Sequence, residues 1–254
     1  MMRIPRALTG FATSLALLTA PVQALDLTAM TEAERAVFGA EVRAYLLENP
    51  EVIIEAVNLL EQRQAVAEAA QDDALVANNL EELHNDGYSW VGGNPDGDIT
   101  LVEFMDYRCG YCRRAAPEVA KLLAADGNIK LIIKEFPILG EASVLTSRFA
   151  IATRIVAGND AYKQVHDALI EFGGEPNEVA LRRLSEGLGL DTDAIMAAMN
   201  APEINQELSQ TRALAQRMNI SGTPTFVLQD ELLRGYLPAD QMSVIIADKR
   251  DQRG

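Results

Sequence analysis

A β-rich run of this chain leads directly into its only two cysteines, Ile99-Thr100-Leu101-Val102-Glu103-Phe104-Met105-Asp106-Tyr107-Arg108-Cys109-Gly110-Tyr111-Cys112. The run from Ile99 to Phe104 predicts a strand, and the apolar spacing between Arg113 and Ala125 predicts a helix. Cys109 therefore lies at a helix N-terminus. The unpaired backbone amides and the dipole at that end of a helix stabilise an anion. We expect Cys109 to react as a thiolate.

The two cysteines have other possible roles. A structural disulfide across so short a loop would contribute only about 2 kcal/mol, which makes it a weak crosslink and a good redox switch. A zinc site needs two further ligands, and His84 and His166 are single residues without paired spacing. Two soft thiolates suit Cu(I), so copper binding stays open as an alternative.

The composition is that of an acidic globular protein. The 254 residues carry a formal charge of −15, and 48% of them are apolar, which is too high a fraction for a disordered chain. Nucleic-acid binding is disfavoured because it needs clustered basic charge. Three arginines nevertheless gather around the cysteines, Arg108, Arg113 and Arg114. We expect them to stabilise a thiolate or to attract an acidic partner.

The first 24 residues have the pattern of a secretory signal. Arg3 and Arg6 precede a mostly apolar stretch, and Val22-Gln23-Ala24 ends in a small residue. We predict cleavage after Ala24, with an uncleaved membrane anchor as the alternative. The apolar stretch is shorter than the roughly 20 residues that span a bilayer. This signal predicts a protein that works outside the cytoplasm, in a periplasm, where disulfides persist.

Residues 25–88 form an acidic helical segment, with 14 acidic residues against three arginines. Thr31 and Glu34 have the spacing of a capping box, which predicts a helix start. Asn49-Pro50 predicts the start of a second helix, whose apolar stripe is too broad to stay exposed. Either these helices pack on the main domain, or they form a homo-oligomer, as an apolar stalk with a helical linker. We favour self-association.

Residues 89–254 predict an α/β domain. A second strand is expected over 130–136, and a long helical region over about 141–219. Ser221-Gly222-Thr223-Pro224 then leads into a strand at 225–228, a paired strand at 232–236 and a closing helix at 238–249. The predicted fold class is a thioredoxin-like α/β fold with a long helical insertion, preceded by the N-terminal helical segment.

Three stretches resemble the DsbA-like branch of the thioredoxin superfamily. They are residues 104–112 with the Cys-Gly-Tyr-Cys motif, Lys134-Glu135-Phe136-Pro137-Ile138-Leu139-Gly140, and Gly222-Thr223-Pro224-Thr225-Phe226. The resemblance covers about residues 89–250. Residues 45–51, Tyr45-Leu46-Leu47-Glu48-Asn49-Pro50-Glu51, are similar to the N-terminal domain of the suppressor-of-copper-sensitivity protein C (ScsC) group, a less specific match over about 30–65.

This resemblance implies roles for six residues. Cys109 corresponds to the nucleophile that attacks a substrate disulfide, and Cys112 to the buried resolving thiol. Pro224 corresponds to the cis-proline beside the active site, where the Thr223 backbone pairs with substrate. Glu103 matches the buried acid of the family, and Lys134 is its expected partner on the neighbouring strand. Together these two would take the proton from Cys112. Neither a cofactor nor a resident metal is implied.

The resemblance also implies a thiol–disulfide oxidoreductase that acts on proteins with cysteines and exchanges electrons with a membrane redox partner. The dipeptide Gly110-Tyr111 and the threonine before Pro224 resemble those of disulfide isomerases, and an oligomerising segment would suit an isomerase. We therefore favour isomerase or reductase activity. The alternatives are a DsbA-type dithiol oxidase and a non-enzymatic copper-binding or chaperone protein.

Overall fold

The structure is a computed structural model that describes residues 29–253, and the predicted signal over 1–24 lies outside them. The chain divides into two compact units, one up to Gln62 and one from Arg63 onward. Each unit is described by itself. Among the described residues, no helix is long and apolar enough to cross a membrane.

The first unit contains α1 (Glu32–Glu48) and the beginning of α2 (Glu51–His84). The predicted capping box is present, because the Thr31 side chain accepts from the Glu34 amide and the Glu34 carboxylate accepts from the Thr31 amide. Asn49 closes α1, where both its amide and its side chain donate to the Tyr45 carbonyl. The unit exposes a series of large apolar side chains: Val37, Phe38, Val42, Tyr45, Leu47, Ile53, Ile54, Val57, Leu59 and Leu60.

The last part of α2 belongs to the second unit, where Val76 and Leu83 are fully buried. This differs from the predicted division after residue 88. The change of composition near Asn85-Asp86-Gly87 marks the end of a helix rather than the end of a unit. The boundary between the units falls inside the continuous helix α2, where the sequence has no turn residue to indicate it.

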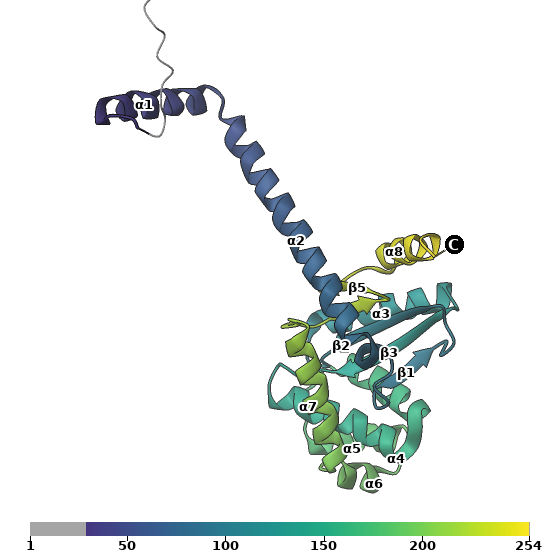
Figure 1. Ribbon diagram of the computed structural model, residues 1–254. Helices are drawn as coiled ribbons and strands as arrows, with labels where there is room; N and C mark the ends of the chain where they lie inside the picture. The colour runs from purple at the N-terminus through teal and green to yellow at the C-terminus, as the bar shows by residue number, and fades with distance from the viewer. Residues whose placement is uncertain (1–28, 254) are drawn as a thin grey trace, which may run out of the picture. The chain divides into compact units, whose positions relative to one another are not determined.

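A five-stranded sheet forms the centre of the second unit (Figure 1). Its order is β1-β3-β2-β4-β5, with β2 and β3 parallel and the other neighbours antiparallel. The strands are β1 (Trp90–Gly93), β2 (Ile99–Met105), β3 (Ile129–Glu135), β4 (Thr225–Leu228) and β5 (Glu231–Arg234). The edge strand β1 was not predicted, since its two glycines resemble a turn.

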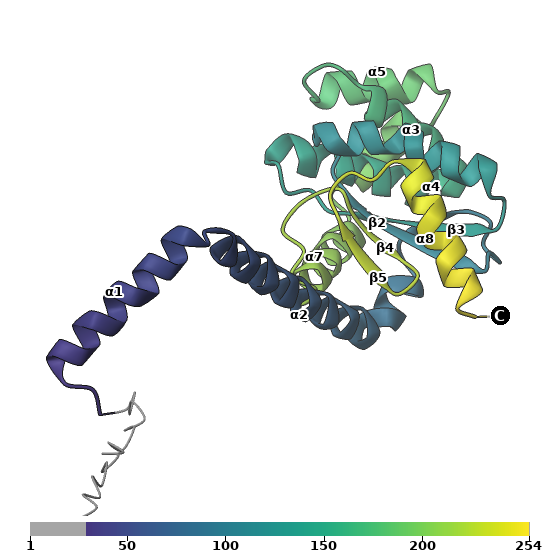
Figure 2. The same ribbon diagram turned by 90° about the horizontal axis from the view of Figure 1, so that it is seen from above.

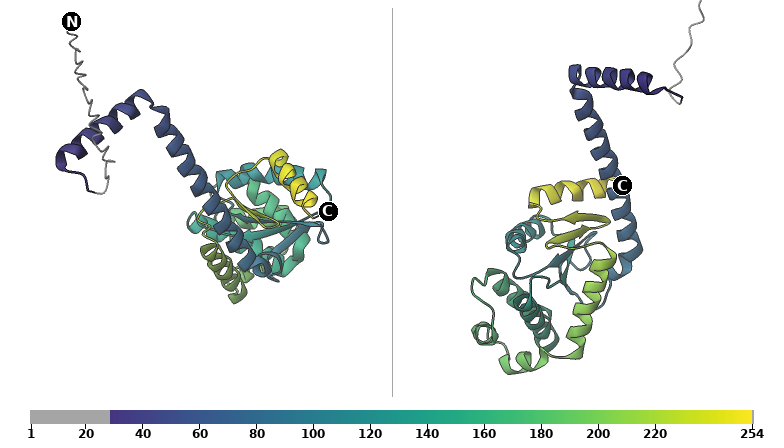
Figure 3. Two further views of the ribbon diagram at one scale, coloured as in Figure 1. Left: turned by 45° about the horizontal axis from the view of Figure 1, so that its top comes forward. Right: turned by 90° about the vertical axis from the view of Figure 1, so that its left-hand side faces the viewer.

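Helices cover both faces of the sheet. α3 (Gly110–Ala125), α4 (Glu141–Glu171) and α8 (Ala239–Asp251) pack with the odd-numbered side chains of β2, such as Leu101 and Met105. The end of α2 and α7 (Pro202–Arg217) pack on the other face, against Val102 and Phe104. Figures 2 and 3 show these layers from other directions.

The predicted helical insertion consists of α4, α5 (Glu178–Gly187), α6 (Thr192–Ala198) and α7. Gly158 interrupts α4 with a positive φ of 86°, which suits a residue without Cβ. Directly after this break, the Asn159 carbonyl accepts from the Trp90 indole at 3.0 Å. The thioredoxin-like α/β fold with a long helical insertion is thus confirmed.

Candidate active site

Cys109 is the N-cap of α3, directly after the strand β2 and a short turn. Its Sγ donates to the Thr223 carbonyl oxygen, 3.0 Å away, although 114 residues separate the two in the chain. The Thr223–Pro224 peptide bond is cis. Both cysteines are free thiols, and Cys109 is 8% exposed while Cys112 is fully buried. The fold therefore brings together four of the six predicted site residues.

Glu103 lies on the face of the sheet that carries Cys112. Burial, together with the charge of Glu135, raises the pKa of Glu103 to about 8. Burial also raises the pKa of Cys112 well above its usual range, and the Glu103 charge adds to that effect. Because the Glu103 charge raises the pKa of Cys112, the buried acid and the resolving thiol belong to one electrostatic site.

The predicted pair of Glu103 with Lys134 is wrong. In the parallel ladder Glu103 is opposite Ile133, whereas Lys134 is opposite Phe104. Successive side chains of a strand point to opposite faces of the sheet. The side chains of Glu103 and Lys134 are therefore both buried, but on different faces. A register shifted by one residue would have put them together.

Lys134 instead fixes the end of α2. Its ammonium donates to Asp86 Oδ2 at 2.5 Å and to the Glu82 carbonyl in the last turn of that helix at 3.0 Å. Burial lowers the pKa of Lys134, and although burial also opposes ionisation of Asp86, the ion pair holds the pKa of Asp86 below its usual range. The Tyr88 ring lies 5.5 Å from the ammonium. Lys134 therefore has a structural site remote from the thiols.

The three arginines near the cysteines all have other partners. Arg108 pairs with Glu175 at 3.2 Å and donates to the Gly174 carbonyl. Arg113 donates to the Tyr107 carbonyl at 3.0 Å, and the Arg114 guanidinium lies 5.4 Å from the ring centre of Tyr111. These contacts shape the loops around the motif. They account for the arginines without a direct contact to a thiolate.

Asp106 is a site residue that the sequence analysis missed. Its carboxylate is fully buried and accepts the Arg108 amide at 2.8 Å, the Ile138 amide at 2.8 Å and the Leu139 amide at 3.1 Å. The Cys109 amide donates to the Asp106 carbonyl at 3.0 Å. One side chain thus joins the turn before the cysteines to the loop after β3. An acid directly after a buried strand was the available signal.

Glu135 at the end of β3 was also missed as a site residue. Its carboxylate accepts three hydroxyl groups, those of Tyr107 at 2.8 Å, Tyr162 at 2.6 Å and Ser147 at 2.7 Å. The side chain is almost fully buried, and burial raises its pKa to about 7. His166 joins this cluster through the Tyr107 hydroxyl at 3.1 Å. Glu135 lies on the same face of the sheet as Glu103.

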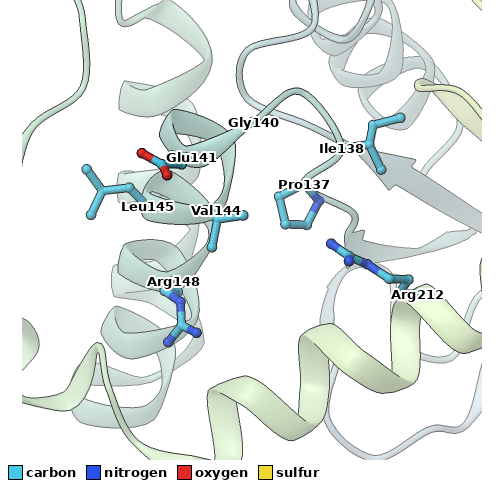
Figure 4. A pocket seen from close by; sticks show the side chains of 8 residues that line it. All are labelled: Pro137, Ile138, Gly140, Glu141, Val144, Leu145, Arg148 and Arg212. Atoms are coloured by element: carbon cyan, nitrogen blue, oxygen red, sulfur yellow. The ribbon is translucent and has the colours of Figure 1, made fainter.

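A pocket of about 630 Å³ lies beside the loop after β3, between the start of α4 and α7 (Figure 4). Its walls are apolar except for Glu141, Arg148 and Arg212. Because Asp106 holds the amides of Ile138 and Leu139, this loop is coupled to the turn before Cys109. Within residues 29–253, no group of three or more His, Cys, Asp or Glu side chains is arranged to hold a metal ion.

Comparison with family models assigns most of the second unit. The model of the DSBA-like thioredoxin domain matches residues 100–247, which is more than half of the chain. The chain belongs to this family. In this DsbA-like domain the matched residues include both cysteines, Thr223 and Pro224. A second model, the N-terminal domain of the copper resistance protein ScsC, matches residues 34–67. Both resemblances expected from the sequence are confirmed.

Known structures share the fold of this DsbA-like chain. A thioredoxin-like oxidoreductase from Silicibacter pomeroyi is 41% identical, with a TM-score of 0.64 over 67% of this chain and 97% of that one. Proteus mirabilis ScsC in a compact conformation is 26% identical, with a TM-score of 0.63 over 84% of this chain and 96% of the other. The resemblance to ScsC thus extends beyond the catalytic domain.

Curated relatives extend the comparison to longer proteins. Disulfide bond formation protein D of Bacillus subtilis is 25% identical over 189 residues, which are 66% of this chain and 84% of that protein. The Na⁺/H⁺ antiporter NhaA 3 of Salinispora tropica is 26% identical over 156 residues. The match to the antiporter spans only 24% of its length, although it covers 61% of this chain. This chain therefore matches only about a quarter of the length of that antiporter.

Proposed function

We propose that this protein is a thiol–disulfide oxidoreductase of secreted proteins, in which Cys109 is the nucleophile and Cys112 the resolving thiol. The observation that carries the proposal is the contact between Cys109 Sγ and the Thr223 carbonyl at the N-terminus of α3. Cys109 is the N-cap of α3, so it lies at the positive end of that helix dipole. The adjacent backbone of Thr223 offers an incoming polypeptide a strand-like partner.

The proposed reaction has two exchange steps. The Cys109 thiolate attacks one sulfur of a substrate disulfide, so that a mixed disulfide forms and one substrate thiolate leaves. Cys112 then loses its proton to Glu103 and attacks the Cys109 sulfur. The second substrate thiolate leaves and the Cys109–Cys112 disulfide forms, so the substrate is reduced by two electrons and the protein is oxidised. In an isomerase cycle, another thiolate of the substrate attacks the substrate sulfur of the mixed disulfide instead. A new substrate disulfide forms and the Cys109 thiolate leaves, so neither protein is oxidised or reduced overall.

Trapping of the mixed disulfide tests this proposal. The Cys112→Ala variant lacks the resolving thiol, so we expect it to accumulate a mixed disulfide with a disulfide-containing peptide. The Cys109→Ala variant is the matched control and should accumulate none. Mass spectrometry of the intact, non-reduced protein measures both. Equal behaviour of the two variants contradicts the redox function and supports a binding protein for copper or unfolded chains.

We propose that isomerase or reductase activity predominates over oxidase activity. Gly110 and Tyr111 within the motif and Thr223 before Pro224 support this direction. Refolding of a scrambled-disulfide substrate with the reduced full chain measures isomerase activity directly. Faster recovery of native substrate than with an equal concentration of free dithiol supports the proposal. Rapid oxidation of reduced substrate by the disulfide form, without isomerisation, supports the oxidase alternative.

We further propose that the segment before residue 63 joins copies of this chain. Its support is the set of exposed apolar side chains on α1 and the start of α2. Exposed apolar residues that occur singly are normal, whereas a group of them marks an interaction site. A double variant, Phe38→Ser and Ile54→Ser, should lower the mass of the full chain in light scattering. The control is Val244→Ser, which changes an apolar residue of α8 at least as exposed as Phe38 and Ile54. An unchanged mass in the double variant contradicts self-association.

The predicted signal over 1–24 supports a periplasmic location for this chemistry. A membrane redox partner would then keep Cys109 and Cys112 in the dithiol state that an isomerase needs. The chain's own dithiol cannot renew itself, because each reduction of a substrate leaves both cysteines oxidised. Fractionation of cells that produce the full chain, followed by thiol labelling, tests location and redox state together. A chain found oxidised in the periplasm would favour the oxidase alternative.

A further inference from the structure

A second acid lies beside Glu103 on the inner face of the sheet. Glu135 is opposite Met105 in the ladder, and Glu103 is two residues before Met105, so the two acids are diagonal neighbours on one face. With strands about 4.8 Å apart and a rise of about 3.3 Å per residue, the Cα atoms of such diagonal neighbours lie roughly 8 Å apart. Glu103 is 5% exposed and Glu135 3%, so water screens their interaction little. Two carboxylates so placed oppose each other's ionisation.

The surroundings of the two acids differ. Three hydroxyl groups converge on the Glu135 carboxylate at 2.6 to 2.8 Å, which favours its charged form. The Tyr107 hydroxyl donates its hydrogen bond to Glu135, so its oxygen can accept one from His166 Nδ1 in the tautomer that carries the proton on that nitrogen. Glu103 faces the thiol of Cys112 instead, whose charged form it opposes. As the pH rises, Glu135 therefore loses its proton before Glu103 does.

We propose that Glu135 is a positioning residue of the redox site, whose negative charge keeps a proton on Glu103 and so sets the pH at which Cys112 can be deprotonated. This inference rests on the proposed function. Glu135 does not touch either sulfur; it acts through Glu103. The hydroxyl cluster of Tyr107, Tyr162 and Ser147 holds its charge in place, and Tyr107 is two residues before Cys109 in the chain.

Other ionisable groups near Glu103 and Glu135 also influence their ionisation. Asp106 lies directly after β2, and its charge opposes ionisation of Glu135. His166 on α4 is held neutral, because burial lowers its pKa to about 4. Glu207 on α7 is also influenced by Glu135, but it pairs with Arg154 at 2.5 Å. The groups that face the two acids are Cys112 from α3, Asp106 and Tyr107 from the turn after β2, and Tyr162 and His166 from α4.

A two-phase reaction with an aromatic disulfide reagent separates the relevant steps. Attack by Cys109 on dithiobis(nitrobenzoate) releases one coloured thiolate, and attack by Cys112 on the mixed disulfide releases the second. We expect the rate of the second phase in the full reduced chain to rise with pH through the ionisation of Glu103. In Glu135→Gln the midpoint of that profile should move down by about one pH unit, because a like charge is removed. Tyr162→Phe, which removes one donor and keeps the ring, should move it less, in the same direction.

The controls distinguish the possible failures. In a Glu103→Gln background, Glu135→Gln should produce no further shift of the midpoint. A midpoint that is unchanged in both Glu135→Gln and Tyr162→Phe, with only lower thermal stability, makes Glu135 a purely structural residue and overturns the inference. The same shift with and without Glu103 also overturns it. Absence of the first phase in the unmodified chain would instead contradict the proposed function of Cys109.

Discussion

The carbonyl oxygen of Thr223 accepts a hydrogen bond from Cys109 Sγ at 3.0 Å, so the loop before β4 touches the first residue of the Cys-Gly-Tyr-Cys motif. This contact uses the backbone of Thr223, so a substitution of the side chain need not remove it. A hydrogen bond from that side chain favours the thiolate of Cys112, against the effects of burial and the Glu103 charge, which raise the pKa of Cys112. The carbonyl oxygen of Thr223 thus contacts Cys109, whereas its side chain acts on Cys112.

Thr223→Val separates these two contributions. The variant keeps the shape and the carbonyl contact, so the rate at which Cys109 forms a mixed disulfide should stay within a factor of about two. It loses the hydroxyl that favours the Cys112 thiolate, so resolution should slow about tenfold, as one hydrogen bond of about 1.4 kcal/mol requires. Rapid-quench thiol trapping measures both rates. Equal slowing of the two steps would show that Thr223 acts mainly on Cys109.

Glu103 makes the reduced protein less stable as the pH rises. Its pKa is about 8 in the folded chain, against about 4.3 in an unfolded one, so folding keeps a proton bound over that interval. The contribution of this bound proton to the free energy of unfolding is fully present below about pH 4.3. It decreases by about 1.4 kcal/mol per pH unit as the pH rises towards 8. Glu103→Gln should lessen this decline and be more stable than the unmodified chain at neutral pH. Urea unfolding of both proteins at several pH values measures the difference, and parallel curves would contradict it.

Much of the catalytic frame is predictable because its signals are local. The apolar run of β2, the cysteines after it and the amphipathic α3 follow from neighbouring residues, and so does the threonine–proline pair before β4. The capping box at Thr31 and Glu34 is equally local. The break in α4 at Gly158 is local as well, because glycine readily adopts the positive φ found there. Each of these features needs only the periodicity or the turn preference of a short segment.

The partners of buried charges are not predictable in this way. Whether Lys134 faces Glu103 depends on the register of β2 against β3, and a shift of one residue reverses the face. The donors to Glu135 come from a turn and from two separate turns of α4, residues 107, 147 and 162. Nothing in their spacing indicates that they converge. An ionisable residue within an apolar strand signals only that some partner exists.

Asp106→Ala tests the junction between the two active-site loops. Removal of the buried carboxylate leaves three partly buried backbone amides without their acceptor, which we expect to cost roughly 3 kcal/mol of unfolding free energy. Asp106→Asn keeps one acceptor oxygen and should lose about half as much. Chemical unfolding measures stability, and hydrogen exchange of the Ile138 and Leu139 amides measures the loop. Unchanged exchange at these amides in Asp106→Ala would contradict the role.

Lys134→Met tests whether the buried lysine fastens α2 to the sheet. The substitution leaves Asp86 buried without its cation and the Glu82 carbonyl without a donor, and loss of one partner of such a pair costs about 3–5 kcal/mol. The matched control is Lys130→Met on the same strand, because Lys130 is only half-buried and donates to one carbonyl, that of His84, at 3.1 Å. It should cost no more than about 1 kcal/mol. Since Lys134 faces away from Cys112, its variant should resolve mixed disulfides at the normal rate in conditions where it is folded. A large loss of that rate, with the unfolding free energy preserved, would show that Lys134 takes part in catalysis and contradict its structural role.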